Sequence, residues 1–164
     1  MRPYARTVAT AEAQMTMRPI RTILLATDLT AASREATDRA IDLAMRLEAR
    51  LLIVNVLEKR RLSGGGSHDR VDQARSEREA ALVKVVRGAR DAGVTAEFLV
   101  WDGDPGDSIA AAAEAEHADL VVVGTRGRSG AERMFLGSVS DHVVRHAECP
   151  VLVVRPPKRR AEVA

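Results

Sequence analysis

Cysteine and aromatic residues are scarce in this chain of 164 residues. The single cysteine, Cys149, cannot form an internal disulfide, so the stapled class of small secreted proteins is excluded and a cytoplasmic location is expected. The aromatic residues are too few for a base-stacking platform or an aromatic cage, since they are only Tyr4, Phe98, Trp101 and Phe135. Valine, leucine, isoleucine and alanine must therefore fill the core.

Long hydrophobic runs and a charge excess of one sign are also missing. No apolar run approaches the ~20 residues that span a bilayer. The 25 basic and 23 acidic side chains nearly cancel, to a formal net charge of +2. A nucleic-acid-binding face needs segregated basic residues, and the one obvious cluster lies in the tail, at residues 155–160. We therefore expect neither a membrane nor a nucleic acid as a partner.

The length suits one domain that buries roughly 70% of the surface of its unfolded chain. Residues 1–18 carry several arginines and no helical or strand pattern, and we interpret them as a flexible N-terminal extension. Residues 19–156 form the expected domain, and residues 157–164 form a basic C-terminal tail.

Apolar runs alternate with segments of helical periodicity from Ile20 onward. Strands are predicted at 23–26, 51–57, 94–100, 119–123 and 151–154, and helices at 33–48, 70–92, 105–116 and 138–147. The stripe expected to be buried in the first helix comprises Ala36, Ala40, Leu43, Ala44 and Leu47.

This alternation of strands and helices predicts the α/β class. Helical crossovers between successive strands imply a parallel sheet with right-handed connections and helices on both faces. The predicted architecture is a three-layer α/β/α sandwich around a five-stranded, doubly wound, Rossmann-like sheet with strand order 3-2-1-4-5. Ligands of such folds lie beyond the carboxyl ends of the strands, where the strand order reverses. The segments after the first and fourth strands are therefore the places to look for a site.

The segment after the first strand lacks the common dinucleotide motif. Residues 26–30 read Ala-Thr-Asp-Leu-Thr and contain no G-x-G-x-x-G, which disfavours a nicotinamide or flavin dehydrogenase. The sequence also has no G-x-x-x-x-G-K-[ST], which disfavours a Walker-type nucleotide hydrolase.

The segment after the fourth strand has the features of a phosphate site. Gly124 and Gly127 allow a backbone to approach an anion closely, and Gly137-Ser138 opens the last helix. A helix N-terminus presents N–H groups with partial positive charge, and the hydroxyls of Ser138 and Ser140 add donors.

Together these residues resemble a family signature. Gly124-x2-Gly127-x9-Gly137-Ser138, followed by the run from Cys149 to Val154, is similar to the signature of the universal stress protein family in its ATP-binding branch. Three upstream segments fit the same pattern: the run from Ile23 to Asp28, Asn55-Val56, and Gly103-Asp104-Pro105. The resemblance covers residues 20–155.

The resemblance implies an ATP-binding protein with a regulatory or stress-tolerance role and at most slow hydrolysis. Asp28 would accept hydrogen bonds from the ribose or adenine, and Mg²⁺ or Mn²⁺ could bridge the phosphates. The resemblance also points to a homodimer, for which the apolar last strand, Val151 to Val154, offers an unpaired edge. The implied nucleotide-binding residues are Ala26, Thr27, Asp28 and Val56 on the base side, Val123 and Gly124 beside the sugar, and Arg126, Gly127, Gly137, Ser138, Val139 and Ser140 at the phosphates.

One departure from the family pattern concerns the loop after the fourth strand. The family commonly has histidine or an aliphatic residue beside the second glycine, whereas this chain has Arg126, with Arg128 and Arg133 farther along. Guanidinium groups would strengthen triphosphate binding, although solvated loop charge is an equal explanation for Arg128 and Arg133. Nucleotide occupancy could order residues 63–69 and 126–135 and so change the surface offered to an unknown protein partner.

Other functions stay open at this point. A phospho-accepting receiver domain is imitated by Asp102, Thr125 and Lys158, although the first strand offers only Asp28 where a pair of acids is wanted. A flavodoxin-like carrier is disfavoured by the lack of aromatic residues, and a nucleotide-free structural member of the same family is a further alternative. His142 and His146 have a spacing able to bind metal, but no third ligand is near in sequence, so no metal site is expected.

Overall fold

The computed structural model describes residues 18–58, 68–125 and 136–155. No helix in these ranges is both long and apolar enough to cross a membrane. The described strands are β1 (Thr22–Ala26), β2 (Arg50–Leu57), β3 (Ala96–Asp102), β4 (Leu120–Gly124) and β5 (Val151–Val154). The described helices are the 3₁₀ turn η1 (Ala31–Ser33) and the α-helices α1 (Arg34–Leu47), α3 (His68–Asp91), α4 (Pro105–Ala115) and α5 (Ser138–His146).

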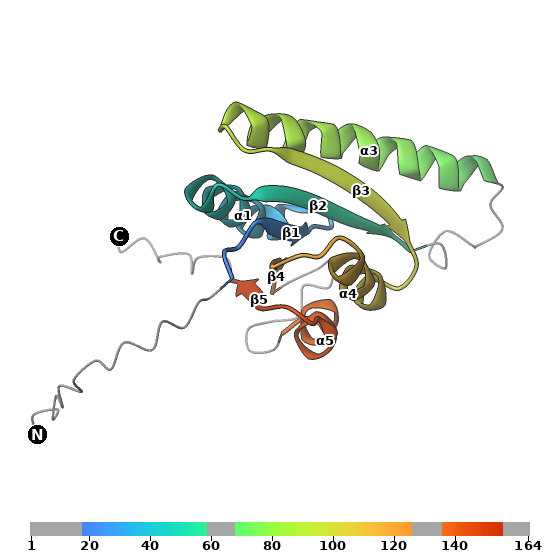
Figure 1. The fold of residues 1–164 in the computed structure, drawn as a ribbon. Coiled ribbons are helices and arrows are strands. Elements are labelled where there is room, and N and C mark those ends of the chain that lie inside the picture. Colours follow the sequence, from blue (N-terminus) through green and yellow to red (C-terminus); the bar gives the residue numbers. More distant parts are fainter. Residues whose placement is uncertain (1–17, 59–67, 126–135, 156–164) are drawn as a thin grey trace, which may run out of the picture.

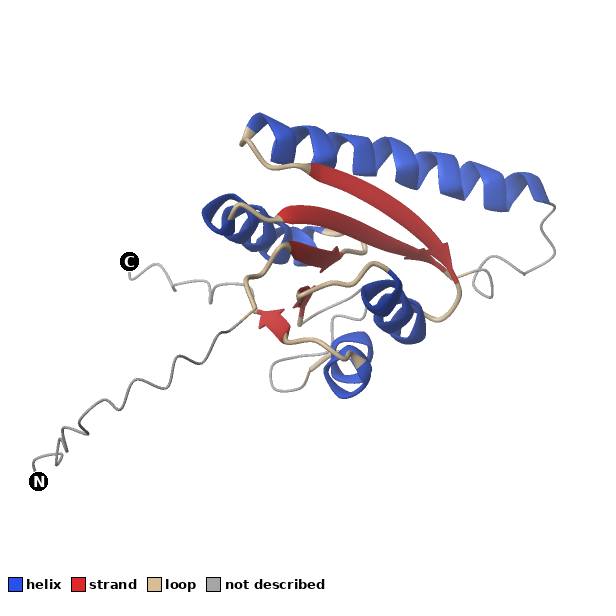
Figure 2. Cartoon of the chain, viewed as in Figure 1, coloured by secondary structure: helices blue, strands red, loops and turns tan. Residues whose placement is uncertain are grey.

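The five strands form one parallel sheet in the order β3-β2-β1-β4-β5, as predicted. The strand order reverses beside β1, which pairs with β2 on one side and with β4 on the other. Figure 1 shows the twisted sheet between its helices, and Figure 2 shows the strands as the middle layer. The carboxyl ends of β1 and β4 therefore lie side by side, which makes the reversal point the expected ligand site.

Each face of the sheet has its own hydrophobic core. Alternate residues of β1 point to opposite faces, so Ile23 and Leu25 pack with α1 and α3, whereas Leu24 and Ala26 pack with α4 and α5. All four of these side chains are buried, which explains why the central strand is apolar without alternation.

The small side chains of α1 bring this helix close to the sheet. Ala36, Ala40 and Ala44 recur at four-residue spacing and are fully buried. Leu47, which we predicted in the same stripe, is 44% exposed, so this part of the prediction was wrong. Leu47 is the last residue of the helix, and Glu48 adopts a left-handed conformation that turns the chain toward β2.

Most element boundaries differ from the prediction by one or two residues. The largest differences are in α3, which begins at His68 instead of residue 70, and in β3, which runs from Ala96 to Asp102 instead of from residue 94 to residue 100. Asp104 caps α4, because its Oδ1 accepts hydrogen bonds from the backbone N–H groups of Gly106, at 2.9 Å, and Asp107, at 3.3 Å. Pro105 occupies the first helical turn, where its missing N–H is tolerated.

Candidate functional site

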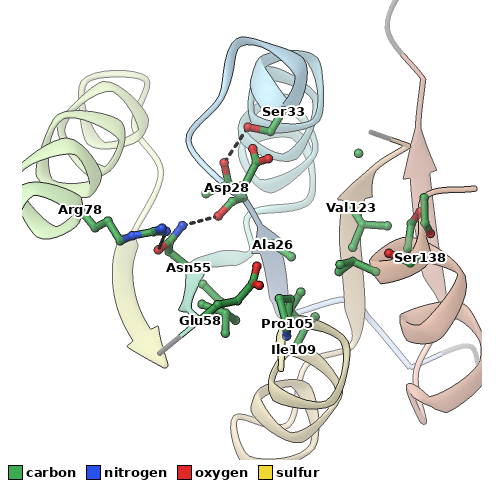
Figure 3. Close-up of a pocket in the computed structure, with 17 residues that line it drawn as sticks. Ala26, Asp28, Ser33, Asn55, Glu58, Arg78, Pro105, Ile109, Val123 and Ser138 are labelled. Atoms are coloured by element: carbon green, nitrogen blue, oxygen red, sulfur yellow. Dashed lines mark hydrogen bonds between the residues drawn. The ribbon is translucent and has the colours of Figure 1, made fainter. Parts of the chain in front are cut away.

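A cavity of about 330 Å³ opens at the carboxyl ends of β1, β2 and β4, where the strand order reverses. Its volume lies at the lower end of the range that is typical of small-molecule sites, about 300 to 1,000 Å³. Elements from both faces of the sheet line it, as the close-up in Figure 3 shows. The cavity is therefore placed where doubly wound folds bind their ligands.

Ten of the twelve residues predicted for the site line this cavity: Ala26, Thr27, Asp28, Val56, Val123, Gly124, Gly137, Ser138, Val139 and Ser140. The other two, Arg126 and Gly127, lie outside the described residues, as do Arg128 and Arg133. Segments that are about 110 residues apart in the sequence thus meet in one cavity, because β1 and β4 are neighbours in the sheet.

Asp28 lies in the turn between β1 and η1, and its carboxylate is partly engaged within that turn. Oδ1 accepts hydrogen bonds from the backbone N–H and the hydroxyl of Thr30, at 3.0 and 2.7 Å. Oδ2 is buried and has no hydrogen-bond partner among the described residues. A buried carboxylate oxygen without a hydrogen-bond donor is energetically unfavourable. A donor group brought by a ligand would therefore stabilise this oxygen.

The N-terminus of α5 forms the opposite end of the cavity. Gly137 is the N-cap residue, and no side chain of the described residues caps this helix, in contrast to α4. The backbone N–H groups of Ser138, Val139 and Ser140 occupy the first turn, where no partner exists within the helix. This end of the cavity consequently carries partial positive charge.

The two serine hydroxyl groups at this end differ in burial and in hydrogen bonding. Ser140 is buried and donates its hydroxyl proton to the carbonyl oxygen of Gly137, at 2.9 Å. Ser138 is exposed at the mouth of the cavity. Gly137 packs closely on the end of β4, because a Cβ atom at this position would lie 3.0 Å from the carbonyl oxygen of Thr125. The N-terminus of α5 can approach β4 only because residue 137 has no side chain.

Sequence reasoning missed seven residues that also line the cavity: Ser33, Val54, Asn55, Glu58, Arg78, Pro105 and Ile109. Asn55 carried a usable signal, since it is the only polar residue between Leu51 and Leu57. Arg78 carried none, because the sequence does not say which face of a long helix meets the end of the sheet.

Asp102 and Thr125, the two described residues that imitate a receiver domain, do not converge. Asp102 ends the edge strand β3, and β2 and β1 separate it from β4 and Thr125. Its Oδ1 is 2.6 Å from a guanidinium nitrogen of Arg75, and Asp102 is absent from the cavity lining. Lys158 lies outside the described residues. The strand order thus removes the geometric basis of the receiver alternative.

The histidines of α5 form contacts of their own. The rings of His142 and His146 stack with centroids 4.0 Å apart, and Nε2 of His142 is 2.8 Å from Oδ1 of Asp107. Among the described residues no group of three histidine, cysteine, aspartate or glutamate side chains is placed to hold a metal ion.

Cys149 is half-buried and packs against the core beneath α4 and α5, where burial raises the pKa of its thiol.

Comparison with known proteins agrees with this geometry. A model of the universal stress protein family matches residues 19–155. Among the relatives, the universal stress protein MJ0531 of Methanocaldococcus jannaschii is 36% identical over 141 residues, which cover 84% of this chain and 83% of that protein.

Solved structures of similar fold include universal stress proteins. UspA of Lactobacillus plantarum superimposes with a TM-score of 0.74 at 23% identity, over 83% of this chain and 98% of that one. A universal stress protein in complex with cAMP has a TM-score of 0.66 at 29% identity, over 84% of this chain and 98% of that one.

Proposed function

The chain belongs to the universal stress protein family, and from this premise we propose that its cavity binds ATP and that the protein acts as a nucleotide-dependent regulator or stress-tolerance factor. The observation that carries the proposal is the polarity of the cavity. One end holds the N-terminus of α5, which no side chain of the described residues caps, and the other holds a carboxylate oxygen of Asp28 to which the described residues supply no donor.

The α5 end suits the phosphates. Three backbone N–H groups and the exposed hydroxyl of Ser138 are available as donors to phosphate oxygens. Gly124, which lines the cavity, has no side chain that would keep an anion away from its backbone. Arg126 and Gly127, which directly follow the described end of β4, are proposed to complete this phosphate site.

The Asp28 end suits the ribose and adenine. A small rotation about Cβ–Cγ, which is a soft torsion, would turn a carboxylate oxygen toward a ribose hydroxyl. Apolar surface for the adenine comes from Ala26, Val56 and Val123, whose side chains line the same cavity. The related structure that was solved with cAMP, at 29% identity, supports an adenine nucleotide as the class of ligand.

A divalent cation would enter as part of the ligand. Since the described residues offer no three-residue metal cluster, Mg²⁺ or Mn²⁺ would take its ligands mainly from phosphate oxygens and water.

The proposed role of the protein is nucleotide binding and slow switching, with at most slow hydrolysis. Nucleotide occupancy would act on an unknown protein partner through residues 63–69 and 126–135; equal protease sensitivity of both segments with and without ATP would argue against this.

We further propose that β5 forms the interface of a homodimer. It is the edge strand next to β4, and it is only four residues long and entirely apolar. An exposed apolar edge favours association, and pairing across a two-fold axis would cover it.

The test of the proposed function starts with the purified protein. Mass spectrometry of the nucleotide released by heating should identify ATP or another adenine nucleotide, and calorimetry should then measure the affinity of the emptied protein for ATP with and without Mg²⁺. Absence of retained nucleotide, together with absence of ATP binding at millimolar concentration, would contradict the proposal.

Two variants locate the site. Asp28→Asn keeps an oxygen for Thr30 but replaces an acceptor by a donor, and it should weaken ATP binding about tenfold, the value of one charge-assisted hydrogen bond. Asp38→Asn removes the same charge on the exposed face of α1 and is the matched control, with unchanged affinity. Gly127→Val should abolish nucleotide retention while the chain still folds.

A further inference from the structure

A chain of two hydrogen bonds connects α3 to the wall of the cavity. A guanidinium nitrogen of Arg78 donates to Oδ1 of Asn55 at 2.7 Å, and Nδ2 of Asn55 donates to the carbonyl oxygen of Thr27, also at 2.7 Å. Figure 3 shows Arg78 on α3 beside Asn55 on β2, and a dashed line leads from Asn55 to the segment that follows β1. The orientation of the amide is unambiguous, because a guanidinium only donates and a carbonyl only accepts.

The burial of Asn55 favours a single arrangement of these two hydrogen bonds. Asn55 is 1% exposed and is the only polar residue between Leu51 and Leu57 of β2. A buried amide that lost one of its partners would be left unsatisfied, which strongly favours the single arrangement in which both ends of Asn55 are bonded. Asn55 therefore fixes the position of the Thr27 carbonyl relative to α3.

The peptide that receives this hydrogen bond leads directly into Asp28. The carbonyl of Thr27 and the backbone N–H of Asp28 belong to one planar unit, so fixing the oxygen restrains the direction in which Asp28 leaves the strand. The rest of the turn is also bonded, with Oγ1 of Thr27 accepting from the N–H of Leu29 at 3.1 Å and lying 3.0 Å from the hydroxyl oxygen of Ser33. Among the hydrogen bonds named here, the one from Asn55 is the one that continues to α3.

We propose that Arg78 and Asn55 are positioning residues, which hold the turn of Thr27 and Asp28 in the geometry that binds the ribose and base. This inference rests on the proposed function, since it assigns these residues a role in nucleotide binding. By thermodynamic reciprocity, a ligand that needs this turn geometry also stabilises the docking of α3 on the sheet. The two hydrogen bonds through Asn55 thus link α3 directly to the occupancy of the cavity. This helix packs on the face of the sheet opposite α4 and α5.

Arg75 provides a matched control on the same helix. It lies one turn before Arg78 and joins α3 to the neighbouring strand β3, with a guanidinium nitrogen 2.6 Å from Oδ1 of Asp102. Neither Arg75 nor Asp102 lines the cavity. Arg75→Met and Arg78→Met therefore each remove a connection between α3 and the sheet, and we expect only the second to affect the site.

The first experiment needs no ligand. In spectra of the ¹⁵N-labelled protein without nucleotide, Arg78→Met should shift the amide resonances of residues 27–30, whereas Arg75→Met should shift those around residues 100–102. Arg78→Lys, which keeps a donor for Asn55, should restore the resonances of residues 27–30 in part. Unchanged resonances of residues 27–30 in Arg78→Met would overturn the proposal.

The second experiment measures ATP affinity by calorimetry. Arg78→Met should weaken binding roughly fivefold or more, in the usual range of coupling between sites, and Arg75→Met should leave it within twofold. Equal losses in the two variants would overturn the positioning role, because they would reflect only the docking of α3. Should the wild-type protein bind no adenine nucleotide, the proposed function fails, and the spectra alone then decide whether Arg78 sets the geometry of the turn.

A double-mutant cycle separates positioning from direct contact. If Arg78 acts through Asn55, then Arg78→Met should cause no further loss of ATP affinity in an Asn55→Leu background. Additive losses would mean that Arg78 touches the nucleotide itself and would overturn the proposal. Where Asn55→Leu fails to fold, the comparison of Arg78→Met with Arg78→Lys and Arg75→Met decides the same question.

Discussion

Nε2 of His142 lies 2.8 Å from Oδ1 of Asp107, and this contact joins α5 to the first turn of α4. The same imidazole lies against Gly106, where a Cβ atom would stand 2.7 Å from Cγ of His142. Contacts this short cannot be accommodated without movement, so the two helices that line one wall of the cavity approach each other only because residue 106 has no side chain.

Gly106→Ala should therefore destabilise the fold. The expected loss is about 1–3 kcal/mol in the free energy of unfolding, the usual range for an overpacked contact, and urea unfolding measures it. Gly88→Ala is the control, because nothing lies within 4 Å of a Cβ at that position in α3. That substitution should stabilise the protein by about 0.5–1 kcal/mol through its helix propensity.

The cause of the Gly106→Ala effect can be tested in a second background. When His142→Ala has removed the ring, the additional loss caused by Gly106→Ala should fall to about 0.5 kcal/mol or less, the limit for independent sites. An undiminished loss would place the strain elsewhere in the first turn of α4.

The stability at acid pH should depend on Asp119. Its carboxylate accepts hydrogen bonds from the backbone N–H groups of Arg21 and Thr22, at 2.8 and 2.9 Å, and these bonds lower its pKa from the ordinary value of 3.8. At a pH between the lowered pKa of the folded protein and the ordinary pKa of the unfolded chain, the unfolded chain binds more protons. The free energy of unfolding therefore rises with pH in this range. The contribution is complete above the ordinary value and is lost as the pH falls through the lowered one.

Asp119→Asn should accordingly make the acid limb of the stability curve shallower, which urea unfolding between pH 2 and pH 6 would show. Asp91→Asn, at the exposed C-terminal end of α3, changes the same charge and is the control. Parallel acid limbs in the wild type and Asp119→Asn would refute the assignment.

Cys149 should react slowly in the folded protein. Burial is the largest influence on this thiol and raises its pKa above the ordinary value of 9.0. Since the thiolate is the reactive form, alkylation by iodoacetamide at pH 7.5 should be much slower for the native protein than for the protein in guanidinium chloride. Equal rates would show that the thiol is not protected by the fold.

The proposed dimer can be tested at one residue of β5. The carbonyl oxygens of Pro150 and Val154 accept hydrogen bonds from β4, so by strand alternation the backbone groups of Val153 point to the outer edge of the described sheet. Val153→Pro should convert a dimer into a monomer in light scattering while urea unfolding stays cooperative, because proline is tolerated at an edge. A monomeric wild-type protein at micromolar concentration would contradict the dimer itself.

Much of the architecture could be predicted because its signals are local. The apolar run of β1 and the Asp104-Pro105 start of α4 are each encoded within a few residues, and the alternation of strands and helices leaves few topologies. Leu47 was misplaced because periodicity does not indicate where a helix leaves the sheet. Arg78 was missed because its role depends on the rotation of α3 relative to β2, which is set by packing across 23 residues of sequence separation.

The cavity takes its lining from both sides of the sheet, with Ser33 and Arg78 from the side of α1 and α3, and Ile109 and Ser140 from the side of α4 and α5. A ligand bound there would contact residues from both helical layers and would link the two layers at the end of the sheet. Loosening of either layer would therefore weaken the binding of that ligand, and the bound ligand would in turn stabilise the packing of both layers on the sheet.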